Sequence, residues 1–206
     1  MSSLMTKFAA GAIGSSAVAG SGYGLYKMHN KEETLKSLLA STPLASSIDS
    51  YKTTFEFTKK TDTELIAMLK GKKSSISDSS SNEDAAPLIE EWCKENIDKK
   101  VGIPDQDEIL RKIKKWCVAQ PSTIEGMLKK PILSTGWNEK YEGIKNQAEV
   151  FNDIKSTEFT DSHKEQKDKG GPALQKWCEA QVKSETHKAG ASELFKKVET
   201  RCTSSS

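Results

Sequence analysis

Apolar residues between positions 85 and 203 recur at the three- and four-residue steps of an amphipathic helix. A run of alternating character is limited to residues 53–57, and it is too short to indicate a sheet. We therefore expect a mainly helical, all-α protein. The apolar stripes that carry this expectation in its best-defined parts are Leu88, Ile89, Trp92 and Cys93; Ile109, Ile113, Trp116 and Cys117; and Trp137, Tyr141, Ile144, Ala148, Phe151 and Ile154.

Breaker and capping residues place the expected helix ends. Proline fits the first turn of a helix, so Pro87 and Pro172 each predict a helix start. Residues 102–104 then break the first pattern, and residues 188–190 break the second. Asp105 or Asp107 is expected to cap the helix after the first break, and Ser192 the helix after the second. Residues 122–125 have the spacing of a capping box for a short helix before Pro131.

The apolar steps from Trp137 to Ile154 predict one amphipathic helix of about eighteen residues. Two polar stretches separate the helical blocks: residues 72–84, which are rich in serine, and residues 155–171. Their composition is typical of linkers or long loops.

The chain contains an internal duplication. A shift of 85 residues superimposes residues 87–117 on residues 172–202 with six identities. Several of these involve Trp, Cys or Pro, which are infrequent residue types. The identical pairs are Pro87/Pro172, Trp92/Trp177, Cys93/Cys178, Glu108/Glu193, Lys112/Lys197 and Cys117/Cys202.

A fainter match at a shift of 89 lies upstream, where Thr34 aligns with Thr123 and Leu39 with Leu128. The change of shift from 89 to 85 places a length difference of four residues between the two matching blocks. We therefore expect two tandem units after the N-terminal segment, residues 31–118 and 121–203. They are called repeat 1 and repeat 2 below.

The N-terminal segment, residues 1–28, includes nineteen uncharged residues from Phe8 to Tyr26. This length is close to the roughly 20 residues that span a bilayer. Three interpretations stay open: a signal peptide cleaved near Ala17-Val18-Ala19, an uncleaved membrane anchor, and a flexible leader rich in Gly, Ala and Ser. Lysines follow the segment at positions 27, 31 and 36, and this favours a body on the inner side of the membrane.

The cysteines form two pairs with equal spacing. Cys93 and Cys117 are 24 residues apart, as are Cys178 and Cys202. Because the spacing recurs with the duplication, disulfides within each repeat are the natural pairing. Each would join the two helices of a hairpin, and closing a loop of this size stabilises the fold by about 3.5 kcal/mol in the chain-entropy model.

Other roles for these cysteines have weaker support. Reduced cysteines buried on helix faces are the main alternative. Zinc is disfavoured because no C-x-x-C step occurs and His29, His163 and His187 have no ligand spacing. The tryptophans beside the cysteines favour core packing over ligand stacking.

Neither the composition nor any motif indicates a catalytic or ligand-binding activity. The net charge is +2, and Arg111 and Arg201 are the only arginines among 31 basic residues. The scarcity of arginine argues against nucleic-acid recognition. The sequence contains no phosphate-binding glycine loop, no H-E-x-x-H and no G-x-S-x-G. We therefore predict no catalytic, cofactor-binding or metal-binding residues and no enzymatic activity.

The chain resembles the uncharacterised paralogous protein families of haemotropic mycoplasmas. The resemblance is carried by the leader from Met1 to Tyr26, the repeated Trp-Cys dipeptides and the segment Lys115 to Ile124. It implies a member of an expanded family with an N-terminal membrane segment, exposed at the surface or exported.

Three functions follow as hypotheses. The first is a non-enzymatic surface or secreted helical protein with a host-interaction or antigenic role, held at a membrane by residues 1–28. The second is an intracellular helical scaffold tethered to the inner leaflet. The third, suggested only by the tryptophans, is a domain that binds a small molecule.

Overall fold

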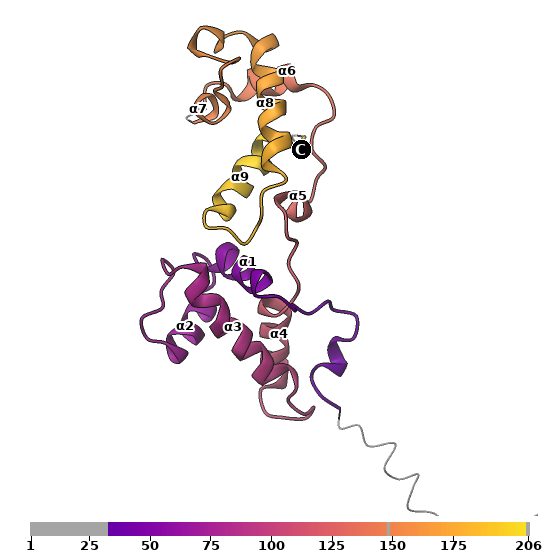
Figure 1. Cartoon of the computed structure of the whole chain (residues 1–206). Helices are drawn as coiled ribbons and strands as arrows, with labels where there is room; N and C mark the ends of the chain where they lie inside the picture. The colour runs from indigo at the N-terminus through magenta and orange to yellow at the C-terminus, as the bar shows by residue number, and fades with distance from the viewer. Residues whose placement is uncertain (1–32, 148, 205–206) are drawn as a thin grey trace, which may run out of the picture. The chain divides into compact units, whose positions relative to one another are not determined.

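A computed structural model describes residues 33–147 and 149–204. The described chain is helical and contains no strand, only four isolated β-bridges, so the all-α prediction is confirmed. Figure 1 shows the helices in chain order. They are α1 (Ile48–Thr58), α2 (Thr63–Lys72), α3 (Asn82–Ile97), α4 (Gln106–Trp116), α5 (Ile124–Met127), α6 (Trp137–Ile144), α7 (Val150–Ile154), α8 (Lys167–Gln181) and α9 (Ala191–Cys202), with 3₁₀ turns at Ser37–Leu39 and Asp161–His163.

Buried apolar residues gather in two clusters. The first lies within residues 35–117 and the second within residues 124–202. In the first, α1 packs against α3, and α3 against α4; in the second, α6 packs against α8, and α8 against α9. Each cluster therefore has a long cysteine-bearing helix at its centre, with one helix before it and one after it in the sequence.

The backbone hydrogen bonds that join the start of each repeat to its later helices occur at matching positions. In both repeats, residues near the start donate backbone hydrogen bonds to the end of the long helix and the loop after it, and a residue further on donates to the second cysteine. Acceptors differ by 85 between the repeats, and donors by 88 or 89. These correspondences support the duplication. Written as donor–acceptor, the pairs are Leu35–Lys99, Lys36–Ile97 and Ala45–Cys117 in repeat 1, and Ile124–Ser184, Glu125–Val182 and Leu133–Cys202 in repeat 2.

The long helices begin earlier than the prolines predict. Pro87 is the sixth residue of α3 and Pro172 the sixth of α8, so neither lies in a first turn. In α3 the start is fixed by Ser81, whose hydroxyl accepts a hydrogen bond from the N–H of Asp84 at 3.1 Å. The hydrogen bond that Pro87 cannot donate would end in the first turn, so it leaves the rest of the ladder intact.

Small residues set the close packing on these helices. In α8, a Cβ on Gly171 would lie 2.8 Å from the backbone nitrogen of Asn138 in α6, and one on Gly170 would overlap the ring of Tyr141. In α3, Ala85 and Ala86 occupy the same two positions and are fully buried. The partner helix, α1 in repeat 1 and α6 in repeat 2, can therefore approach the long helix closely.

The predicted eighteen-residue helix is wrong, because the chain breaks into α6 and α7. Between them the helical hydrogen bonds stop, and Glu149 adopts a left-handed φ of 76°. The apolar steps continue across the break because Ile144, Val150 and Ile154 are all buried in the same cluster. Periodicity alone therefore could not reveal the break.

Other local expectations also change. Residues 53–57 lie inside α1 and are helical. Gly190, not Ser192, precedes the first residue of α9, and Asp105 precedes α4 without a hydrogen bond from its side chain; both residues have left-handed φ values. Thr123 caps α5, which ends at Met127, before Pro131.

The two predicted linkers are shorter than expected. The first shrinks to residues 73–81, where Ile76 is buried, and the second to residues 155–166, where Phe159 is buried. Each therefore contributes to a hydrophobic cluster.

No helix within residues 33–204 as described is long and apolar enough to cross a membrane. The predicted membrane or signal segment, residues 1–28, lies outside the described residues.

Candidate functional site

The four cysteines lie where the two helices of each hairpin meet. Cys93 is joined to Cys117 and Cys178 to Cys202, with a Cα–Cα distance of 5.7 Å in both pairs. All four side chains are buried. This is the within-repeat pairing that the equal spacing predicts, and it fastens α3 to the end of α4 and α8 to the end of α9.

Beside the disulfide of repeat 1 lies a buried tryptophan that is hydrogen-bonded to a buried acid. The indole N–H of Trp116 donates to Asp62 at 2.7 Å, and its ring meets that of Trp92 edge-on at 5.0 Å between centroids. One oxygen of Asp62 also caps α2 by accepting from the N–H of Leu65. Lys115 lies 2.9 Å from the other oxygen, the one that accepts from Trp116. The carboxylate therefore ties the end of α4 to the start of α2.

Beside the disulfide of repeat 2, an arginine takes the place of that tryptophan. Arg201 is nearly buried and donates to Asp153 at 2.5 Å, while Lys197 donates to the same oxygen at 3.0 Å. The guanidinium carbon lies 5.3 Å from the ring centroid of Trp177. Trp177 and Arg201 are the 85-residue counterparts of Trp92 and Trp116, so a cation–π contact replaces an aromatic pair.

Both acids are held in their charged form. Burial alone raises the pKa of the Asp62 carboxyl, but hydrogen bonds from Lys115 and Trp116 outweigh it, and the pKa lies below its ordinary value. The pKa of Asp153 is lowered in the same way, with burial opposed by hydrogen bonds from Arg201 and Lys197. These carboxylates therefore stabilise the fold only while they are ionised.

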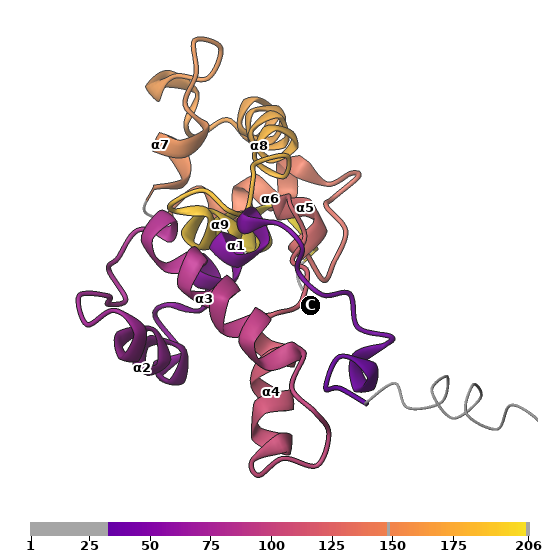
Figure 2. The same ribbon diagram turned by 60° about the horizontal axis from the view of Figure 1, so that its bottom comes forward.

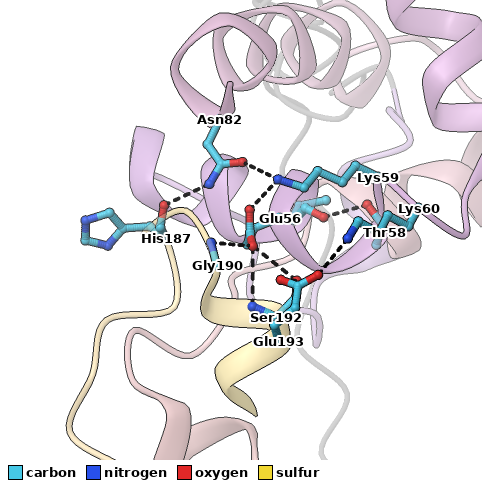
Figure 3. Close-up of polar contacts among 10 residues, drawn as sticks. Glu56, Thr58, Lys59, Lys60, Asn82, His187, Gly190, Ser192 and Glu193 are labelled. Carbon is cyan, nitrogen blue, oxygen red and sulfur yellow. Dashed lines mark hydrogen bonds and ion pairs between the residues drawn. The ribbon is translucent and has the colours of Figure 1, made fainter. Parts of the chain in front are cut away.

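A third acid, Glu56 of α1, is buried and joins the two repeats (Figure 3). One of its oxygens accepts hydrogen bonds from the backbone N–H of Gly190 at 3.0 Å and the hydroxyl of Ser192 at 3.1 Å, at the start of α9. Its other oxygen accepts from Lys59 at 2.6 Å. Burial raises the pKa of Glu56, yet hydrogen bonds from Lys59 and Asn82 bring it below the ordinary value. A carboxylate at a helix N-terminus also interacts favourably with the helix dipole.

Further contacts surround this acid. Asn82 donates to the carbonyl of His187 at 3.2 Å, and Lys60 pairs with Glu193 at 2.7 Å at the exposed edge, as Figure 3 shows. The rings of Phe57 and Phe195 meet edge-on with centroids 5.7 Å apart. The contact between the repeats is thus polar and apolar at once.

A cleft of about 540 Å³ lies in repeat 2, along α8, the helix that carries Cys178. One wall is the face of α8 that carries Pro172, Ala173 and Trp177, and the opposite wall is the segment after α7, with Phe159. Lysines and acids lie along its rim, including Lys169, Lys176, Asp168 and Glu158. The cleft combines an indole surface with charged groups, which is a composition suited to binding rather than to a defined reaction.

The described residues contain no group of three or more His, Cys, Asp or Glu placed to hold a metal ion. His163 stacks near Phe159, and His187 lies 3.8 Å from Glu185. Neither lies in a cluster of metal-ligating side chains.

Comparisons with protein-family models, with curated proteins and with solved structures gave no significant match to this chain.

Sequence reasoning placed the four cysteines and missed three acids, of which Asp62 and Glu56 are buried and Asp153 is partly exposed. Asp62, Asp153 and Glu56 reach partners between 44 and 136 residues away, and no local pattern marks such contacts. Arg201 did carry a signal, because it precedes Cys202 whereas a tryptophan precedes each of the other three cysteines.

Proposed function

We propose that this protein works outside the cytoplasm as a non-enzymatic helical recognition protein, attached to a membrane or released through residues 1–28. The observation that carries the proposal is the pairing of all four cysteines into two buried disulfides at matching positions of the two repeats. Structural disulfides persist in oxidising compartments and are rare in reducing ones.

The burial of the disulfides adds to this support. Helical units of about eighty residues have marginal cores, and a bond that closes a loop of 24 residues adds about 3.5 kcal/mol by the chain-entropy account. In each repeat both cysteines are fully buried members of the apolar cluster. In a reducing compartment the same cysteines would contribute only as small buried apolar side chains.

A recognition role is supported by the cleft along α8, which offers an indole surface and charged rims without a nucleophile, base and orienting group set in hydrogen-bonded series. The resemblance to expanded, exported mycoplasma families agrees with a protein that meets a host molecule. The partner in this proposal is a protein at the cell surface of a host.

Surface proteolysis of intact cells tests the location. The proposal predicts that a protease added outside cleaves the body of the chain, and that cleavage increases when a reductant is present. A cytoplasmic protein of the same cells serves as the control for lysis. Full protection of the body until the membrane is permeabilised would contradict the proposal.

The lysines at positions 27, 31 and 36 favour the second candidate, a scaffold on the inner leaflet. The same experiment separates the two candidates, since the scaffold would be protected in intact cells.

A further inference from the structure

The cleft of repeat 2 corresponds to a helix face that lies beside α2 in repeat 1. The offset of 85 places Pro172, Ala173 and Trp177 of α8 on Pro87, Leu88 and Trp92 of α3. In repeat 1 this face adjoins α2, and the side chains of Leu65 and Leu69 in α2 are fully buried in the same cluster as α3. Figures 1 and 2 both show α2 alongside α3.

The covering helix is shortened in repeat 2. α2 has ten residues, whereas α7 has five and ends at Ile154. The chain then continues as a loop through Phe159 instead of following the long helix. The cleft along α8 is therefore the space that a helix of the length of α2 would occupy.

The cleft is elongated. Its lining on this helix runs from Asp168 to Gln181, which corresponds to about 20 Å at 1.5 Å per residue. A ten-residue helix is about 15 Å long. An extended occupant fits this length better than a compact small molecule does.

The charges along this face are changed between the repeats. In repeat 1, Lys72 at the end of α2 pairs with Glu91 at 3.4 Å and with Glu95 at 3.0 Å, and Lys73 pairs with Asp84 at 3.4 Å. The counterparts of these three acids in α8 are Lys176, Ala180 and Lys169, in that order. Lysine or alanine thus stands at each position where the face of repeat 1 uses an acid to hold its covering helix.

Other acids near the cleft are Asp168, Glu158 and Asp153. Asp153 is engaged by Arg201 and Lys197, and Glu158 lies 3.4 Å from Lys176. Lys169 and Lys176 are both exposed. An acidic group on an incoming helix would therefore meet lysine at the positions where α2 presents lysine to acids.

We propose that the cleft of repeat 2 binds an amphipathic helix of a partner protein, with an apolar stripe against Trp177 and Ala173 and acidic residues against Lys169 and Lys176. This proposal rests on the recognition role proposed above and names its partner by chemistry. Helix-in-groove recognition uses apolar anchors at steps of three and four residues, as α2 does within the chain.

A charge-swap experiment with two peptides tests the proposal. The first peptide is residues 62–74 of this chain, made helical by a side-chain staple on its exposed face. The second is the same peptide with K72E/K73E. Each is titrated into the oxidised full chain, with binding followed by NMR shifts. We expect the acidic peptide to bind at least tenfold more tightly than the lysine peptide, with shifts in α8 and residues 155–159.

Variants of the chain complete the test. K169E/K176E is expected to reverse the order of the two peptides, and K114E/K129E, an equal charge change at exposed lysines elsewhere, is expected to leave it unchanged. Ala180→Glu restores the acid that repeat 1 has at Glu95, and it is expected to weaken the acidic peptide and strengthen the lysine peptide.

Three results would overturn the inference: no binding of the acidic peptide, equal binding of both peptides, or an order that K169E/K176E and Ala180→Glu leave unchanged. Such a result would not affect the proposed location outside the cytoplasm, which surface proteolysis tests separately.

Discussion

The two repeats build the same disulfide hairpin but stabilise it with different groups. In repeat 1 the residue before the second cysteine is Trp116, whose uncharged indole donates one hydrogen bond to the Asp62 carboxylate. In repeat 2 it is Arg201, which forms an ion pair with Asp153. The acceptor is an aspartate in both, and a tryptophan of the long helix lies against the donor in both.

This comparison shows which parts of the arrangement are interchangeable. The backbone contacts, the cysteines and an aspartate carboxylate recur, whereas the donor changes from a neutral indole to a charged guanidinium. In repeat 2 the donor itself, together with Lys197, balances the charge of Asp153, whereas in repeat 1 Lys115 balances the charge of Asp62. Both donors therefore bond to a charged acceptor, and a hydrogen bond to a charged group contributes more than one between neutral groups.

The largest effect is expected from removing either cysteine pair. C93A/C117A and C178A/C202A should each lower the free energy of unfolding by about 3.5 kcal/mol, because both pairs close a loop of the same length. Urea denaturation of the two variants and the wild type measures this directly. A loss in one repeat only would break the equivalence that the comparison assumes.

The next effect distinguishes the two arginines. Arg201→Met leaves Asp153 with Lys197 alone and should lower the free energy of unfolding by about 3 kcal/mol, because one partner of a nearly buried ion pair is lost.

Arg111→Met is the matched control, since Arg111 holds Glu64 with two hydrogen bonds of 3.0 and 2.8 Å but is half exposed. It should change stability little. Equal urea midpoints for the two methionine variants would contradict the importance given to Arg201.

The third largest change in stability is expected at the contact between the repeats. Glu56→Gln should lower the free energy of unfolding by about 2 kcal/mol at pH 7, because a charge-assisted acceptor for Lys59 and for the start of α9 is replaced by a neutral amide. Glu83→Gln, which changes an exposed carboxylate 3.7 Å from Lys52, is the control and should have little effect.

Glu56→Gln should also change how the stability of the protein depends on pH. The pKa of Glu56 is lowered in the folded protein, so its stabilising effect is complete above the ordinary value of 4.5 and is lost as pH falls through the folded value. The wild type should therefore lose stability below about pH 4.5 more steeply than Glu56→Gln does. Parallel pH profiles of unfolding for the two proteins would show that Glu56 does not make this contribution.

The smallest effect is expected for a single indole hydrogen bond, and it is measured by comparing two buried tryptophans. Trp116→Phe removes the hydrogen bond to Asp62, whereas Trp137→Phe removes an N–H that has no partner among the described residues. Both changes remove the same atoms, so the difference between them isolates the hydrogen bond. Trp116→Phe should be more destabilising by about 1.5 kcal/mol in urea denaturation. No difference, or the opposite order, would contradict the role given to Trp116.

The sequence predicts the helices and the cysteine partners because these depend on spacing. The stripe around Trp92 and Cys93 gives α3, and the repeated separation of 24 gives the pairing. It does not predict the break before Glu149, because the apolar steps run across it without a change. It also does not predict Glu56, whose partners near Gly190 are brought to it only by the folded chain.

The cleft along α8 shows a further limit. The sequence identifies Pro172 and Trp177 as counterparts of Pro87 and Trp92, but the length of the covering helix is decided where the polar segment after Ile154 leaves the helical path. The shift from 89 to 85 places a length difference between the matching blocks without showing which helix is shortened.

Mass mapping of the cysteines under non-reducing conditions, in protein taken from its native cells with free thiols blocked at lysis, tests the central claim most directly. The account predicts two disulfide-linked fragments, one joining Cys93 to Cys117 and the other joining Cys178 to Cys202. Recovery of blocked free thiols at these four positions, or of fragments that cross between the repeats, would contradict it.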